Sequence, residues 1–361
     1  MLDNPTLREA ILSSSPVLPD EGEVIGRSRE GRPLRGFRFG HGPLRVSLIA
    51  GCHSDEPIGP ALLRRLSRYL MDAPPDTPVL ERCEFWVVPH ANPDGEVVNH
   101  AWEEGLAGST EGASGAAYDP VAFLAHMMRE LPGDDVEFCF PKDEHDLGAR
   151  PENRAIYEWL GSEGLPYDVH ASLHGMAMSA GPFFLLDAAW ADRCGSLKGR
   201  CVTEVERLGY TLHDVERHGE KGFHRLERGF GTRPDSRAMR EHFLAIGDET
   251  TANRFRPSSM EAVRSFGGDC LTVVSEMPLF ITPGVGETLG PPDPVREAWL
   301  ERRNRWVVML RSGEGHPDVD AAAVVAAEIA ESGLRPMSIR DQMALQWTLV
   351  TAAIELVASQ Q

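Results

Sequence analysis

Short apolar runs alternate along this chain with segments of helical spacing. The runs are rich in β-branched and aromatic residues and are bounded by glycine, proline or polar residues, which is typical of buried strands. They lie at residues 44–50, 83–88, 167–174, 181–186 and 271–277. Before the first run, residues 22–40 have the pattern of two short strands around a turn at Glu30 and Gly31, which predicts a hairpin.

Between these runs, apolar residues recur at intervals of three and four, which predicts helices with one buried face. A short helix is predicted after Asn4, with Pro5 at the first helical position, where proline is favoured. Another begins just after Glu56. The remaining predicted helices lie at residues 151–164, 295–310, 318–332 and 339–358. Strands that alternate with helices indicate an α/β domain with a parallel or mixed sheet.

Three segments interrupt this alternation. The sequence NPDG at residues 92–95 predicts a turn, and residues 105–118 predict a loop. Near the end of the chain, SGEGHPD at residues 312–318 sets off the last helices. We therefore expect a main domain over residues 1–315 and a helical extension packed on it over residues 316–361.

Polar residues follow several predicted strands at the point where each strand ends. His53 and Glu56 come just after the strand at 44–50, and His174 and Glu276 lie at the ends of two later strands. Ligands of open α/β sheets bind beyond the carboxyl ends of the strands. Two imidazoles and one carboxylate suffice for a catalytic zinc site with an open coordination position. Glu276 could then act as general base on a metal-activated water.

His170 competes with His174 as the third ligand. On a helix, the four-residue spacing in HASLH would let both imidazoles face one ion. The alternation of apolar and polar residues over 169–174 predicts a strand instead, where four residues span about 13 Å at about 3.3 Å each. His174, at the exposed end before Gly175, is therefore the predicted ligand.

Each of these residues also has a purely structural interpretation. A single H-x-x-E motif is commonly a pair of surface residues, and His174 alone could be a hydrogen-bonded core histidine. Glu276 alone could form a buried ion pair with an arginine. The position of all four polar groups at predicted strand ends favours a metal site.

The composition narrows the class of protein. Hydrophobic residues make up 42% of the 361 residues and charged residues 25%, as in soluble globular domains. The formal net charge of −19 argues against nucleic-acid and membrane partners, because the field of the protein would repel both. Six scattered cysteines without a C-x-x-C pair, and no signal-peptide pattern, favour a cytoplasmic location. The sequence leaves the oligomeric state open.

The ordered motifs resemble those of the zinc carboxypeptidase family (M14 metallopeptidases). The hairpin segment IGRSREGRP precedes a strand that ends in HSDE at residues 53–56. NPDG, RPENRAIYEWL, SLHG at His174 and TVVSEM at Glu276 then follow in the family's order. Each motif alone is unspecific, but the ordered set, over about residues 22–306, is quite specific.

The resemblance implies a mixed, mostly parallel sheet of about eight strands flanked by helices, with the C-terminal helices added to it. It also implies one zinc ion. The implied site residues are the metal ligands His53, Glu56 and His174 and the general base Glu276. Asp135 matches the aspartate that orients the first zinc histidine. Arg129 matches, at a shifted spacing, the arginine that stabilises the oxyanion.

The segment GDDVEFCFP at residues 133–141 departs from the family's pattern G-V-D-L-N-R-N-F-P. The Asn-Arg pair that binds the substrate's terminal carboxylate is here Glu137 and Phe138, which cannot pair with a carboxylate. The family's tyrosine before the catalytic glutamate is also absent, although Arg254 or Arg256 could point into the pocket. We expect a substrate-binding role for Glu137, Phe138 and Arg254, and a substrate that is amine-bearing or has a blocked carboxylate.

Together, the residues and the resemblance predict a zinc-dependent hydrolase that cleaves an amide bond of a peptide or acylated amino-acid substrate. One alternative is an N-acyl-amino-acid amidohydrolase similar to aspartoacylase and succinylglutamate desuccinylase, which share the same four polar groups. A third interpretation, suggested by the missing clamp and tyrosine, is a metal-binding interaction protein that has lost catalysis. Residues 213–256 are expected to contain an arginine-rich insertion that either covers the cleft or forms a solvated helix.

Overall fold

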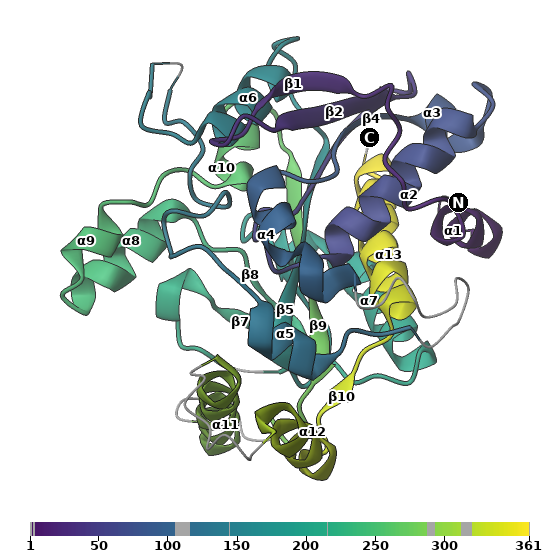
Figure 1. Ribbon diagram of the computed structural model, residues 1–361. Coiled ribbons are helices and arrows are strands. Elements are labelled where there is room, and N and C mark those ends of the chain that lie inside the picture. The colour runs from purple at the N-terminus through teal and green to yellow at the C-terminus, as the bar shows by residue number, and fades with distance from the viewer. Residues whose placement is uncertain are drawn as a thin grey trace.

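The structure is a computed structural model that describes residues 2, 4–104, 116–143, 145–214, 216–286, 293–311 and 320–360. Its strands are β1 (Glu23–Arg27), β2 (Pro33–Phe39), β3 (Leu44–Ala50), β4 (Cys83–Val88), β5 (Val169–Ser179), β6 (Phe183–Leu186), β7 (Arg225–Glu227), β8 (Phe230–Thr232), β9 (Leu271–Ile281) and β10 (Arg335–Pro336). Over the described residues they form one ten-stranded sheet in the order β1-β2-β4-β3-β5-β9-β6-β8-β7, with β10 paired to β9 (Figure 1).

Thirteen α-helices are described around this sheet. They are α1 (Pro5–Leu12), α2 (Ile58–Asp72), α3 (Pro78–Arg82), α4 (Pro93–Glu104), α5 (Pro120–His126), α6 (Pro151–Leu160), α7 (Gly195–Arg207), α8 (Ser236–Ala245), α9 (Glu249–Ala252), α10 (Ser259–Arg264), α11 (Pro294–Arg311), α12 (Ala321–Ser332) and α13 (Ile339–Ala358). The architecture is the expected mixed α/β fold, because β4, β3, β5 and β9 are parallel at its centre while the outer pairs include antiparallel ones.

Two layers of helices enclose the sheet. On one face, α13 packs against both α2 and α7, as Figure 1 shows. On the other face, α6 and α10 cover Trp86 and Val88 of β4 and form a second apolar cluster. The carboxyl ends of β3 and β5 lie between these layers, so the residues that follow them sit at the edge of a rigid, fully packed core.

The C-terminal segment is a central part of this packing. Fifteen of the 20 residues of α13 are buried, and the helix contacts β9 as well as α2 and α7. Gln346 donates a hydrogen bond of 3.1 Å to the carbonyl of His174 on β5. The predicted boundary at 315/316 lies outside the described residues, and the division into domain and extension stays a prediction.

Most predicted elements are confirmed within a few residues, including the capped first helix, where Asn4 accepts from the Thr6 amide. The turn predicted at NPDG is wrong, because Pro93 opens α4 and the side chain of Asn92 accepts from the Gly95 amide at 3.0 Å, as a helix cap does. The loop predicted at residues 105–118 lies largely outside the described residues.

The arginine-rich region contributes strands as well as helices. β7 and β8 extend the main sheet beyond β6, and their three-residue length leaves too little pattern to predict them. Helix α8 has no buried residue among those described, in agreement with a solvated helix. No helix of the described part of the chain is both long and apolar enough to cross a lipid bilayer.

Candidate metal centre

Gly51 lets the chain turn sharply as it leaves β3. Its φ of +68° lies in the left-handed region, which glycine adopts at little steric cost. A Cβ atom at this position would also lie 2.6 Å from the ring of His90. In the turn that follows, the Glu56 amide donates to the His53 carbonyl, and the two side chains come into contact.

The pairing of β5 with β9 places His174 beside Glu276. The two residues are direct partners in the parallel register, so their side chains leave the sheet on the same face. β5 also pairs with β3, whose last residue, Ala50, lies opposite Leu173. Because β3, β5 and β9 are neighbours, polar residues from distant parts of the sequence meet at one edge of the sheet.

The side chains of His53, Glu56 and His174 form a compact cluster of donor atoms. The Nδ1 atoms of the two histidines lie 3.2 Å apart. One oxygen of Glu56 is 2.8 Å from His53 Nδ1, and the other is 2.9 Å from His174 Nδ1. Glu56 and His174 are buried, and only 16% of the His53 side chain is exposed.

This donor set fits a zinc ion. Zinc in proteins is tetrahedral, with bonds of about 2.0–2.2 Å to histidine nitrogen and carboxylate oxygen, so neighbouring donors lie about 3.3 Å apart. The contacts of 2.8 to 3.2 Å within the cluster are close to that spacing. Two histidines and one glutamate also leave one corner of the tetrahedron open.

The cluster carries the negative charge that a divalent cation needs. Burial alone would raise the pKa of the Glu56 carboxyl, but the charges of His53, Arg129 and His174 hold it well below its usual value. Burial likewise disfavours a charged His174, but the carboxylates of Glu56 and Glu137 raise the pKa of its imidazole well above the usual value. Glu56 is therefore an anion at neutral pH.

A second carboxylate holds the far side of the His174 ring. His174 Nε2 lies 3.2 Å from Glu137 Oε2 and 2.7 Å from Ser172 Oγ. Arg233 donates to the other oxygen of Glu137 at 3.1 Å and to Ser259 Oγ at 2.7 Å, and its side chain is only 2% exposed. Despite burial, His174 and Arg233 lower the pKa of Glu137 to about 2. A carboxylate in this position fixes the orientation of a metal-binding histidine.

Replacing Glu137 with glutamine is expected to weaken zinc binding by about 10- to 100-fold, because the amide keeps the size of the side chain but loses the charge that orients His174. Competition with a chromophoric chelator measures this affinity, and near-UV circular dichroism checks that the variant is folded. Glu158 is exposed on α6, so Glu158→Gln is the matched control and should bind zinc like the wild type. Equal affinity of folded Glu137→Gln and wild type would contradict this role.

Cys52, Glu137 and His174 also bring donor atoms within 4.8 Å of one another. This second set suits a cation less well. Burial raises the pKa of the Cys52 thiol to about 11, so the sulfur stays protonated at neutral pH. Glu137 is already neutralised by Arg233. The first set is therefore the better candidate for the metal.

Glu276 lies beside the cluster without joining it. Among the described residues, no cationic side chain forms an ion pair with its carboxylate, so the structural alternative of a buried ion pair is not realised there. Burial and the negative charge of Glu56 raise the pKa of Glu276 to about 8 in the metal-free protein. A bound cation would lower that pKa, toward the range in which a carboxylate serves as a base at neutral pH.

Arg129 and Asp135 lie near the cluster as well. Arg129 NH1 is 3.0 Å from Glu56 Oε1 and 3.2 Å from Asp55 Oδ1, while 39% of its side chain remains exposed to solvent. Burial raises the pKa of Asp135, and the nearby imidazole of His53 offsets part of that rise. Both residues thus lie close to charged groups of the cluster. The role of Arg129 in catalysis and that of Asp135 in orienting His53 stay predictions.

Two other predicted site residues lie outside the cluster. Phe138 is buried, and its ring packs edge to face on Phe255 with 5.4 Å between the ring centres. Arg254 is exposed and lines a surface hollow with Arg29 and Asp134. The substrate contacts expected of Phe138 and Arg254 stay predictions.

His170 has both ring nitrogens bonded inside the core. Its Nδ1 lies 2.6 Å from Ser47 Oγ and its Nε2 lies 3.1 Å from Ser259 Oγ. Burial and the charge of Arg233 hold the pKa of this imidazole well below its usual value, so the ring is neutral. His170 is therefore a structural histidine on the strand that the alternating pattern predicted.

Sequence reasoning missed the support of His174 by Ser172, Glu137 and Arg233. The alternating pattern of β5 contains a signal for Ser172, because it puts this residue on the same face as His174. No signal in the sequence connects Arg233 with Glu137, which is 96 residues away. Only the place of β8 in the sheet brings the two side chains together.

Comparison with known proteins extends this picture. Residues 21–183 match the sequence model of the zinc carboxypeptidase family. Carboxypeptidase E of Caenorhabditis elegans is 25% identical over 169 residues, which are 42% of this chain and 35% of that protein. Carboxypeptidase SOL1 of Arabidopsis thaliana is 27% identical over 167 residues, which are 43% of this chain and 29% of that protein. This chain thus spans about a third of the length of these curated relatives.

Solved structures are similar to this chain at lower sequence identity. The metallo-carboxypeptidase of Burkholderia cenocepacia is 14% identical at a TM-score of 0.43, over 99% of this chain and 70% of that one. Bovine thrombin-activatable fibrinolysis inhibitor, solved with tick carboxypeptidase inhibitor, is 13% identical at a TM-score of 0.44, over 90% and 95% of the two chains. These two likenesses bear on neither function nor substrate. The sequence match over residues 21–183, which contains His53, Glu56 and His174, shows that this part of the chain is similar to the zinc carboxypeptidase family.

Proposed function

We propose that this protein is a zinc-dependent hydrolase that cleaves an amide bond in a peptide or peptide-like substrate. The observation that carries the proposal is the meeting of His53, Glu56 and His174 at the sheet edge, with the carboxylate of Glu276 beside them on the same face. The similarity of residues 21–183 to the zinc carboxypeptidase family supports the reaction class. One ion is proposed, because the first cluster supplies one set of three donors.

Zinc bound by this cluster would supply Lewis-acid activation of the scissile carbonyl and of the attacking water. Glu276 accepts a proton from that water and transfers it to the nitrogen of the leaving amine. The amide bond breaks as the water oxygen joins the carbonyl carbon, which leaves a carboxylic acid and an amine. Arg129 donates N–H groups to the carbonyl oxygen and stabilises the negative charge that develops there.

Glu137 is better suited to support the metal centre than to bind the substrate. Its two oxygens are engaged by His174 and Arg233, at 3.2 and 3.1 Å. A substrate amine would have to displace one of these partners, at the cost of leaving a buried charge without its counterion. We therefore propose that Glu137, fixed by Arg233, is a positioning residue for His174.

The segment that replaces the carboxylate clamp offers no cation to a substrate. Glu137 is an anion and Phe138 is buried against Phe255. We propose on this basis that a free terminal carboxylate is not required for cleavage. Other parts of the cleft then recognise the substrate.

Three matched sets of substrates test the proposed function: tripeptides with a free C-terminus, the same tripeptides with an amidated C-terminus, and N-acyl amino acids. With zinc-loaded protein, we expect cleavage of both peptide sets with kcat/KM values within about fivefold, the usual effect of one exposed charge pair. Activity should disappear on chelation and return when zinc is added.

Each other outcome would count against part of this proposal. Cleavage confined to N-acyl amino acids would assign the chain to the amidohydrolase alternative. Zinc binding without turnover of any substrate would favour the metal-binding protein without catalysis. A fall in kcat/KM of about 100-fold or more on amidation would show that a carboxylate clamp exists elsewhere in the cleft, since a desolvated charge pair has an effect of that size.

A further inference from the structure

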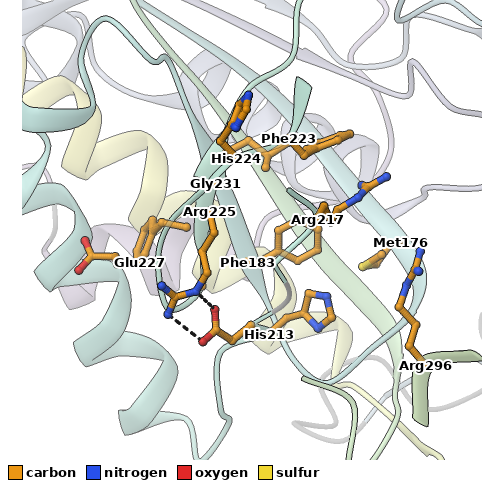
Figure 2. Close-up of a pocket in the computed structure, with 14 residues that line it drawn as sticks. Met176, Phe183, His213, Arg217, Phe223, His224, Arg225, Glu227, Gly231 and Arg296 are labelled. Carbon is orange, nitrogen blue, oxygen red and sulfur yellow. Dashed lines mark hydrogen bonds and ion pairs between the residues drawn. The ribbon is translucent and has the colours of Figure 1, made fainter. Parts of the chain in front are cut away.

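A pocket opens next to the metal cluster on the same face of the sheet. Met176 follows His174 by two residues on β5, so its side chain leaves the same face about 7 Å further along the strand. Phe183 of β6 is the antiparallel partner of Glu276, and such partners lie about 5 Å apart. Met176 and Phe183 both line the pocket, whose volume is about 100 Å³ (Figure 2).

The inner wall of this pocket is apolar and large enough for a side chain. It is lined by Met176, Phe183, Leu185, Phe223 and Phe230. A single water needs about 10–15 Å³ measured in this way, so a pocket of this volume takes several heavy atoms. Methylene groups of a substrate would pack well against such a wall.

The acids that line the pocket already have cationic partners. Arg225 donates to both oxygens of Asp214, at 2.7 and 3.0 Å, as the dashed lines in Figure 2 show. Glu227 pairs with Lys198 at 2.6 Å, and Figure 2 shows its carboxylate pointing away from the pocket. Among the lining residues that the structure describes, these are the two acids, so no lining carboxylate is left for a further cation.

Two cations, Arg217 and Lys221, share the carboxylate of Glu220 beside the pocket. The guanidinium of Arg217 lies 4.2 Å from the centre of the Phe223 ring and 3.2 Å from Glu220, which is also 3.9 Å from Lys221. Arg296 of α11 is exposed at the edge, and no carboxylate of the described residues pairs with it. Burial and the charges of Arg217 and Arg296 lower the pKa of Lys221. The charge of Asp293 also acts on this region, through His213, so Arg296 is the lining cation that no described carboxylate pairs with.

His213 adds a neutral hydrogen-bond donor to the same wall. Its Nδ1 accepts a hydrogen bond from the Ala180 amide at 3.3 Å, so the proton of the neutral ring is on Nε2. Burial and the charge of Arg296 lower the pKa of this imidazole to about 4, which keeps it neutral at pH 7. The mouth of the pocket therefore presents N–H donors together with positive charge.

We propose that this pocket receives a carboxylate-bearing side chain of the substrate residue next to the scissile amide, with Arg296 and Arg217 as its cationic partners. The proposal rests on the proposed function, because it takes the metal cluster as the place where the amide is cut. Guanidinium groups pair with carboxylates through two parallel N–H donors, while the aromatic wall takes the methylenes. A basic side chain would instead meet cations at the mouth.

Two substrates test this inference: benzoylglycyl-glutamate α-amide and benzoylglycyl-glutamine α-amide, whose side chains differ mainly in charge. We expect kcat/KM to be higher for the glutamate substrate by about tenfold or more, the effect of a charge-assisted hydrogen bond. Arg296→Gln should remove most of this preference by raising KM for the glutamate substrate. The ratio of kcat/KM for the two substrates should therefore fall toward equality in this variant.

A matched control comes from the same helix. Arg305 is exposed on α11 and pairs with Glu328, away from the pocket. Arg305→Gln should keep the full preference for the glutamate substrate. Arg217→Gln offers a second variant inside the pocket and should lower the preference in the same direction as Arg296→Gln.

A binding measurement separates this inference from the proposed function. Calorimetry of zinc-loaded Glu276→Gln with N-acetylglutamate α-amide and N-acetylglutamine α-amide needs no turnover, and the glutamate compound should bind about tenfold tighter. That preference without turnover of any substrate by the wild type would support the pocket and overturn the proposed function. Turnover with equal kcat/KM and equal binding for the two side chains would overturn the inference about the pocket and leave the hydrolase proposal standing.

Discussion

Replacing Glu276 with glutamine is expected to lower kcat for amide hydrolysis by about 10²- to 10⁴-fold, the usual contribution of a general base. Glutamine keeps the size of the side chain but cannot take a proton from water. The zinc content should not change, because Glu276 is not among the donor atoms of the cluster. Steady-state kinetics and metal analysis of the same sample measure both quantities.

The same substitution is expected to stabilise the metal-free protein at higher pH. Burial and Glu56 raise the pKa of Glu276 from its ordinary 4.5 to about 8. The folded state therefore keeps a proton that the unfolded state loses between these values, and Glu276 costs stability as pH rises from 4.5 to about 8. The difference in Tm between Glu276→Gln and wild type, both without metal, should grow over that range.

Glu158→Gln again provides the control, because it removes a carboxylate from the exposed side of α6. It should change neither kcat nor the pH dependence of Tm. If folded, zinc-loaded Glu276→Gln kept more than about a tenth of the wild-type kcat, Glu276 would not be the general base, since the loss would be too small for that role.

Replacing His174 with alanine is expected to have the largest effect on the metal. The substitution removes the Nδ1 atom that contacts both His53 and Glu56, at 3.2 and 2.9 Å. The zinc affinity should therefore fall by more than the roughly 10- to 100-fold expected for residues that only orient a ligand. Chelator competition measures the affinity, and turnover should be lost with it.

His41 gives the matched control for this variant. It is exposed just before β3, and only its backbone amide makes a described hydrogen bond, to the Leu80 carbonyl. His41→Ala should bind zinc and turn over substrate like the wild type. Zinc affinity that is unchanged in folded His174→Ala would show that the metal binds elsewhere.

The fold could be predicted in outline because its central strands are buried on both faces. β3, β4 and β9 are almost continuous apolar runs, and such runs carry a clear signal. β7 and β8 carry no such signal, because three residues are too few to show a period. α4 was mistaken for a turn because Asn92, Pro93 and Gly95 favour both a turn and the start of a capped helix.

The candidate site could be located because strand ends concentrate functional side chains. The alternating pattern of β5 predicts a strand, on which His170 and His174 lie too far apart to bind one ion. The structure gives the two rings different partners. What the pattern could not give is the register of β5 against β9, which places His174 opposite Glu276. Register is set by the packing of whole layers, so it becomes visible only in three dimensions.

The contacts that hold the far side of the His174 ring cannot be predicted from the sequence either, because they also depend on how the strands are arranged. Arg233, just after β8, and His174 engage the two oxygens of Glu137, and the substrate-binding role expected of Glu137 stays a prediction. Long-range polar contacts of this kind have no periodic trace in a sequence. The burial of α13 against α2 and α7 is a similar case, because an apolar pattern alone does not show which elements a helix packs against.

The most direct test of the central claim is anomalous X-ray diffraction from crystals of the zinc-loaded protein, with data collected on both sides of the zinc absorption edge. We predict one zinc peak, at about 2.0–2.2 Å from a nitrogen of His53, a nitrogen of His174 and an oxygen of Glu56. A peak among Cys52, Glu137 and His174 instead, or no zinc peak on this face of the sheet, would contradict the account.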